Sequence, residues 1–187
     1  MVSSPDSNIR VEFTLQDNGR PSYEVYHQDE LVIGTSFLGF DLLNAPSLKD
    51  NFKVSNIARS AFNETWPMPW GEQLEVINNY NELRVDLTET TGLQRSILIT
   101  YRVFDDGFGF KFDFPNQENL KEVSITEENT EFALTGDHLA FWAPGDWDIY
   151  EHLYNTSPVS KINAIAKRGH SNLGQHTYIP ENAVNTP

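Results

Sequence analysis

Acidic and aromatic side chains gather in one short stretch of the chain, residues 142–151. Its carboxylates are Asp146, Asp148 and Glu151, and its aromatic residues are Trp142, Trp147 and Tyr150. Calcium takes about six to eight oxygen ligands, and carboxylates are its usual anionic ones. Aromatic rings stack on the C–H faces of sugars, so this stretch suits a hard cation and a sugar. The alternative is a solvated loop whose rings pack on the domain, with Asp146 and Asp148 as turn formers.

A second candidate sugar site consists of Trp66, Trp70 and Glu72. The two rings could stack on a sugar while the carboxylate accepts hydrogen bonds from its hydroxyl groups. Pro67 and Pro69 space the two Trp residues along an extended segment. The alternative is that both rings pack, either in a core or against another domain.

Histidines offer further polar groups. They are His27, His138, His152, His170 and His176, and no two have the i, i+4 spacing of a helical zinc pair. His138 follows Asp137, and His152 adjoins Glu151. Each of these two could bond a sugar hydroxyl, and a structural hydrogen bond is the alternative.

No catalytic pair can be identified from the acidic residues. Glycoside hydrolysis needs two carboxyl groups across the scissile bond. Spacing alone places neither Glu72 with Glu75 nor Glu127 with Glu128 at such a bond, and both pairs are typical of a solvent-facing surface. The sequence also lacks a nucleophile elbow around a Ser and a phosphate-binding loop.

Composition narrows the class of protein. The chain has 187 residues, 39% of them apolar, which is enough for one domain with a proper core. A net charge of −14 argues against a nucleic-acid partner, because phosphate binding needs a basic face. There is no Cys, so disulfides and thiolate metal sites are excluded. Residues 1–9 lack the pattern of a signal peptide, and no apolar run is long enough to span a membrane.

The elements that would position these residues are strands. Apolar residues alternate with polar ones along four segments: residues 9–15, 83–87, 97–103 and 108–114. A period of two indicates strands with one buried face. Asp17-Asn18-Gly19-Arg20-Pro21 separates the first two strands, and Asp105-Asp106-Gly107 predicts a tight hairpin, because Asp-Gly tolerates positive φ. We therefore expect a large antiparallel β-sandwich and no helix.

The alternation stops near Trp142, and the rest of the chain is polar sequence punctuated by Pro and Gly. The chain ends at Asn185-Thr186-Pro187 without an evident closing strand. We expect the sandwich to be incomplete at this end, although a flexible tail would look the same.

Four stretches resemble the N-terminal domain of family 97 glycoside hydrolases, which are calcium-dependent α-glucosidases and α-galactosidases. They occur in the family's order and span nearly the whole chain: residues 4–6 with 9–15 and 19–23; 62–72 with 79–83; 104–115; and 136–138 with 141–151. The second, with Trp66-Pro67-Met68-Pro69-Trp70-Gly71, and the fourth, with Trp142-Ala143-Pro144-Gly145-Asp146-Trp147, are the specific ones.

The resemblance implies an all-β fold, an antiparallel β-supersandwich similar to galactose mutarotase domains. Residues 1–187 would be that domain, truncated before a catalytic (β/α)8 barrel. Glu151 matches the Glu that reaches the active-site calcium in calcium-dependent members, with the other ligands, the general acid and the base or nucleophile in the barrel. The chain alone would then be inert, with an α-glycoside and the barrel of the same polypeptide as its partners. Location in the periplasm, or secretion, is implied by the family alone.

Trp66, Trp70, Glu72, His138 and Trp147 are the candidate substrate-binding residues, and Glu151 is the candidate metal ligand. If Trp66 and Trp70 pack instead, a contact with the barrel is the preferred form of that alternative. A free-standing carbohydrate-binding sandwich without catalysis is the second hypothesis for the chain. A third is an aldose epimerase, which would need a His–Glu acid/base pair across a sheet face, and no such arrangement is evident.

Overall fold

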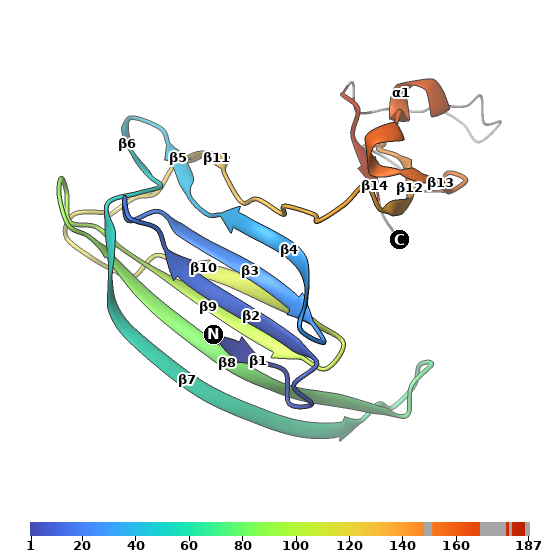
Figure 1. Cartoon of the computed structure of the whole chain (residues 1–187), viewed down its shortest axis with the longest axis horizontal. Coiled ribbons are helices and arrows are strands. Elements are labelled where there is room, and N and C mark those ends of the chain that lie inside the picture. Colours follow the sequence, from blue (N-terminus) through green and yellow to red (C-terminus); the bar gives the residue numbers. More distant parts are fainter. Residues whose placement is uncertain (148–150, 169–178, 180, 186–187) are drawn as a thin grey trace. The chain divides into compact units, whose positions relative to one another are not determined.

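The computed structural model describes residues 1–147, 151–168, 179 and 181–185. The chain forms two compact units, Met1–Thr135 and Gly136–Pro187. They are called here the N-terminal and the C-terminal unit, and each is described by itself (Figure 1). Strands dominate the described residues of both units, and they are antiparallel, so the all-β prediction is confirmed.

Two four-stranded sheets make up most of the N-terminal unit. The first has the order β1-β2-β3-β4, with β1 (Val2–Ser3), β2 (Ile9–Leu15), β3 (Pro21–His27) and β4 (Glu30–Phe37). The second has the order β10-β9-β8-β7, with β7 (Phe52–Pro67), β8 (Glu75–Glu89), β9 (Ser96–Phe104) and β10 (Gly107–Asp113). A smaller sheet has the order β11-β5-β6, with β5 (Phe40–Leu42), β6 (Ala45–Leu48) and β11 (Ile125–Glu128).

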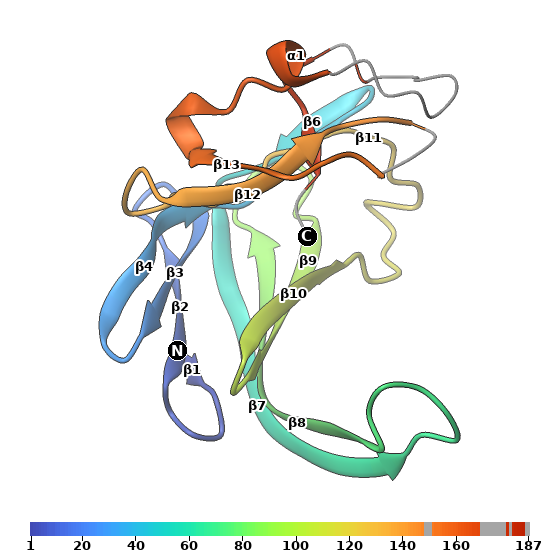
Figure 2. The same ribbon diagram turned by 90° about the vertical axis from the view of Figure 1, so that its right-hand side faces the viewer.

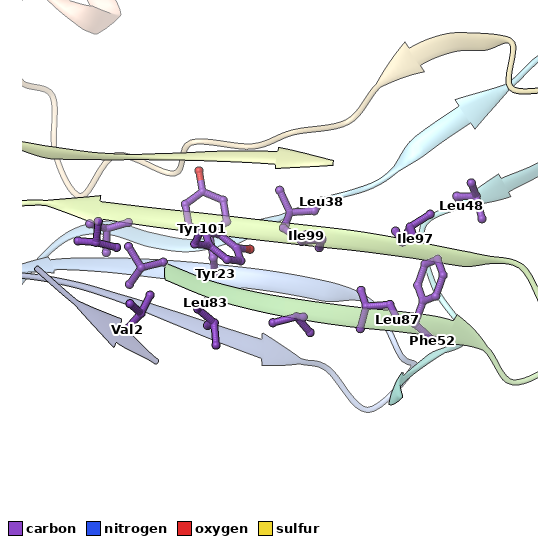
Figure 3. Close-up of a cluster of buried hydrophobic side chains, with 14 of the residues drawn as sticks. Val2, Tyr23, Leu38, Leu48, Phe52, Leu83, Leu87, Ile97, Ile99 and Tyr101 are labelled. Atoms are coloured by element: carbon purple, nitrogen blue, oxygen red, sulfur yellow. The ribbon is translucent and has the colours of Figure 1, made fainter. Parts of the chain in front are cut away.

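The core lies between these sheets, as the alternation predicts (Figure 3). Its buried members are Val2, Val11, Tyr23, Val25, Leu38, Phe40, Leu48, Phe52, Leu83, Val85, Leu87, Ile97, Ile99, Tyr101 and Val103. Phe108, Phe110, Phe112 and Phe114 pack against it and are partly buried. Burying a side chain of this size contributes about 1.5–3 kcal/mol, so the two inner faces hold the sheets together.

Two predicted turns are present, for different physical reasons. Gly19, between β2 and β3, has φ of +73°, and a Cβ there would lie 2.5 Å from the backbone nitrogen of Phe52. Between β9 and β10, Phe104 pairs with Gly107, which leaves Asp105 and Asp106 as a two-residue loop. The predicted tight hairpin is therefore present, but it does not use the positive φ that Asp-Gly permits, since no residue from Asp105 to Gly107 has one.

A buried ion pair joins the β8–β9 hairpin to β6. The Arg95 and Glu89 side chains are only 1% and 8% exposed, and Arg95 Nη2 lies 2.6 Å from Glu89 Oε1. Arg95 also donates to the carbonyl oxygens of Pro46 and Ser47 at 2.8 and 3.1 Å. Burial alone would raise the pKa of Glu89, but its hydrogen bonds from Arg95 outweigh burial and lower it.

The C-terminal unit contains a three-stranded sheet in the order β13-β12-β14, with β12 (Leu139–Pro144), β13 (Asn155–Pro158) and β14 (Val184–Asn185). A 3-10 turn (Val159–Lys161) and a short helix α1 (Ala164–Lys167) follow β13. The helix α1 and the strand β14 were not expected from the sequence. Elements of four and two residues are too short to show a period. No helix in the described residues could cross a membrane.

Candidate functional site

β12 and β13 fix one end of the acidic and aromatic stretch. Trp142 on β12 is 1% exposed, and its indole Nε1 donates to Ser157 Oγ on β13 at 3.0 Å. A satisfied, buried indole is a packing residue. The ring of Trp142 therefore packs within the unit, which was the alternative to sugar stacking, and presents no face to a ligand.

Asp146, within the stretch, pairs with His152, which directly follows it. The Asp146 side chain is fully buried and that of His152 is 8% exposed, with His152 Nε2 lying 3.3 Å from Asp146 Oδ2. A buried carboxylate needs partners of this kind. This contact of His152 is thus the structural hydrogen bond that was the alternative to a bond with a sugar hydroxyl. Asp146 is no solvated carboxylate, because it is enclosed within the unit.

Glu151 differs from Asp146 in its exposure and in its partners. It is exposed, and its carboxylate has no hydrogen bond or ion pair within the described part of the chain. Trp147 is also outward-facing, with 70% of its surface exposed. Asp148 and Tyr150, the other members of the stretch, lie outside the described residues.

Asp137 and His138 precede β12 and contact the 3-10 turn. Asp137 accepts from the Ser160 backbone N–H at 2.8 Å and from the Ser160 hydroxyl at 2.7 Å, and these bonds lower its pKa. The backbone of His138 accepts from Val159 N–H at 3.0 Å. The His138 ring is exposed and lies near Gly136. The role of Asp137 was missed in the sequence, where a hydrogen bond to a residue 23 positions away leaves no signal.

Trp66, Trp70 and Glu72 belong to the N-terminal unit. Trp66 lies on β7 and is 38% exposed, and Trp70 lies in the β7–β8 loop and is 84% exposed. Glu72 is exposed in the same loop. The core alternative is therefore wrong for Trp70. The candidate residues are divided between the two units, with His138, Trp147 and Glu151 in the C-terminal one.

One protein family matches nearly the whole chain. It is described as Glycosyl-hydrolase 97 N-terminal, and it matches residues 2–186. The chain belongs to this family. The resemblance found in the sequence is therefore confirmed.

Solved structures agree with the assignment of this family 97 domain. A glycoside hydrolase family 97 enzyme from Pseudoalteromonas sp. strain K8, a variant in complex with panose, is 32% identical over 87% of this chain, with a TM-score of 0.80. The enzyme from the same strain in complex with acarbose is 33% identical over 84% of the chain, with a TM-score of 0.78. A β-arabinopyranosidase at 21% identity and a TM-score of 0.70 shares the fold. This chain spans about a quarter of each of these chains, namely 25%, 24% and 26%.

The described part of the family 97 domain brings few metal-binding side chains together. Among the described residues, no group of three or more His, Asp or Glu side chains could hold a metal ion. Calcium takes about six to eight oxygens, and Glu151 supplies one carboxylate. A calcium site that includes Glu151 therefore needs ligands besides the His, Asp and Glu side chains that the described residues bring together.

A cleft that the sequence did not predict lies beside β1. It has a volume of about 430 Å³ and is lined by residues that include Met1, Ser3, Arg59, Asn81 and Glu82. None of the candidate site residues lines it.

Proposed function

We propose that this domain is part of a calcium-dependent, exo-acting α-glycosidase that removes terminal α-glucosyl or α-galactosyl residues. Family membership and the Pseudoalteromonas enzyme, which was solved with panose and with acarbose, support this proposal. On resemblance to the family alone, we also propose that the enzyme is periplasmic or secreted. The barrel of the same polypeptide would carry the catalytic carboxylates.

The observation that carries the proposal is the exposed carboxylate of Glu151 beside an anchored neighbour. His152 is held against the buried Asp146 at 3.3 Å, which ties down the backbone next to Glu151. The Glu151 side chain remains exposed and without a partner in the described residues. A carboxylate held in this way can ligate a cation whose remaining ligands come from another part of the protein.

In the reaction, the domain would help to hold the calcium ion and would shield one side of the substrate pocket. Calcium bound there would supply Lewis-acid polarisation and a template for the substrate. Glu151 would contribute one anionic oxygen ligand, while the exposed ring of Trp147 and the imidazole of His138 would contact the sugar. The domain would wall one side of the pocket and brace the barrel.

The test is the substitution Glu151→Gln in the intact enzyme that carries this domain. The amide keeps the size of the side chain but loses its charge, so we expect half-maximal activity to require about tenfold or more calcium. Activity is measured while calcium is titrated against a chelator. Glu30→Gln, at an exposed carboxylate in β4, is the matched control. An unchanged titration for Glu151→Gln would refute the proposal.

The exposure of Trp70, at 84%, favours a second function, in which the chain is a free-standing carbohydrate-binding sandwich. That function predicts that the 187-residue chain binds an oligosaccharide alone. Titration of its tryptophan fluorescence with panose would decide between the two functions.

A further inference from the structure

The β7–β8 hairpin projects beyond the rest of its sheet as a two-stranded arm. The arm comprises residues 61–67 of β7, the loop 68–74 and residues 75–80 of β8. Pairing between β8 and β9 starts only at Asn81, so the arm has no third strand. Figures 1 and 2 show it extending past the ends of β9 and β10. An isolated two-stranded ribbon is at best marginally stable in water.

Apolar side chains of the arm are open to solvent. Six of them are at least 38% exposed: Phe62 (42%), Trp66 (38%), Met68 (38%), Trp70 (84%), Leu74 (78%) and Ile77 (68%). Exposed apolar residues gathered in this way mark an interaction surface. Because the ribbon itself has no stable core, the arm needs a partner that covers these side chains.

Both faces of the arm carry apolar residues. Trp66 lies opposite Val76, and Phe62 lies opposite Tyr80, whose ring it stacks on at a centroid distance of 5.4 Å. Ile77, opposite Thr65, is on the other face, because neighbouring residues of a strand point to opposite sides. The partner surface must therefore be a groove that receives the ribbon from two sides.

The negative charge of the arm indicates which side chains should line this groove. From residue 61 to residue 80 the sequence contains Glu64, Glu72 and Glu75 but no Lys or Arg. A second copy would bring one acidic arm against another acidic chain, since the net charge is −14. Like charges brought together at an interface oppose binding. The groove that receives the arm must instead combine an apolar floor with a rim of Lys or Arg.

We propose that the arm docks into an apolar, basic-rimmed groove in the part of the same polypeptide that lies beyond this domain. The inference deepens the proposed function and rests on it, because it requires that the domain belong to a longer enzyme. The Pseudoalteromonas enzyme has such additional length, since this chain covers only 25% of it. Trp66 and Trp70 thereby act as packing residues between domains.

The test is the accessibility of a single thiol at the tip of the arm. The chain has no Cys, so Leu74→Cys introduces a unique label site in it. Leu93→Cys is the matched control, because Leu93 is a 48% exposed leucine in the β8–β9 loop of the same sheet. The rate of reaction with a maleimide is measured by peptide mapping, in the 187-residue chain and in the intact enzyme.

We expect the thiol of Leu74→Cys to react about tenfold or more slowly in the intact enzyme, because a covered thiol reacts only when the contact opens. The thiol of Leu93→Cys should react at the same rate in both proteins. Three results would overturn the proposal: equal rates at Leu74→Cys, protection only after panose is added, or protection of the short chain that grows with its concentration. Labelling needs neither calcium nor turnover, so it can succeed even if Glu151 proves not to be a ligand.

Discussion

At the scale of residues, two carboxylates of one sequence stretch have opposite environments. Asp146 is buried against His152, whereas Glu151 is exposed and unpartnered in the described structure. The sequence shows only that both are acidic and five positions apart. The difference depends on the tertiary contacts of each side chain, which local residue types do not specify. A prediction about ligation therefore belongs to Glu151 alone, on the strength of its exposure.

The buried pair of Arg95 and Glu89 leads to a residue-scale prediction about stability. Arg95→Met removes the positive partner and leaves Glu89 charged and buried, so we expect a loss of about 3–5 kcal/mol in the free energy of unfolding. The control is Arg84→Met, because the Arg84 side chain is 47% exposed in its pair with Asp86. An exposed pair is worth about 0–1 kcal/mol. Urea denaturation measures both variants, and equal losses would contradict the argument.

At the scale of elements, Gly19 is expected to fix the junction between β2 and β3. Gly19→Ala places a Cβ 2.5 Å from the backbone nitrogen of Phe52 at a φ of +73°, so the backbone must move. Gly92→Ala is the matched control, since Gly92 has φ of +67° with open space around it. Left-handed strain alone costs about 1–2 kcal/mol. We expect the thermal midpoint to fall distinctly further for Gly19→Ala, and equal shifts would show that the contact with Phe52 is unimportant.

Strands that bury one face were predictable, and strands that bury neither were not. Leu83, Val85 and Leu87 alternate with polar residues because the core accepts only one side of β8. All residues of β7 after Phe52 are exposed, so no apolar period appears along it and the sequence gives no signal for its length. The arm was missed for the same reason. Its Trp66 and Trp70 were noticed for their chemistry, while their position at a hairpin tip depends on the pairing of β7 with β8.

At the scale of the whole molecule, the family could be predicted from the sequence, but the site could not be assembled from it. Motifs such as the one around Trp142 and Trp147 are local and specific, and the match over residues 2–186 confirms what they indicate. Ligation of calcium by Glu151 stays a prediction, because Glu151 belongs to no group of three His, Asp or Glu side chains in the described residues. Substrate contact by Trp147 or His138 likewise stays a prediction, because a pocket wall is defined by what faces it.

The aromatic core makes the stability of the whole molecule sensitive to alkaline pH. Burial raises the pKa of Tyr23 to about 12 and also raises that of Tyr101, whereas tyrosine in an unfolded chain ionises near pH ~10. Above that pH the unfolded chain releases protons that the folded chain retains. The stabilising contribution of these tyrosines is therefore complete below pH ~10 and is lost as pH rises through the folded pKa values.

Tyr101→Phe separates this effect from a general loss of stability in alkali. The hydroxyl of Tyr101 is buried and has no hydrogen-bond partner within the described structure. Its removal relieves an unsatisfied group, so we expect a gain of about 1 kcal/mol at neutral pH. The variant should also lose less stability than the parent between neutral pH and the pKa of Tyr23. Urea midpoints measured along this pH series, with tyrosinate absorbance as a second signal, check both expectations. A parent curve that stays flat, or a variant with the same slope as the parent, would mean that the core tyrosines do not control the alkaline limit.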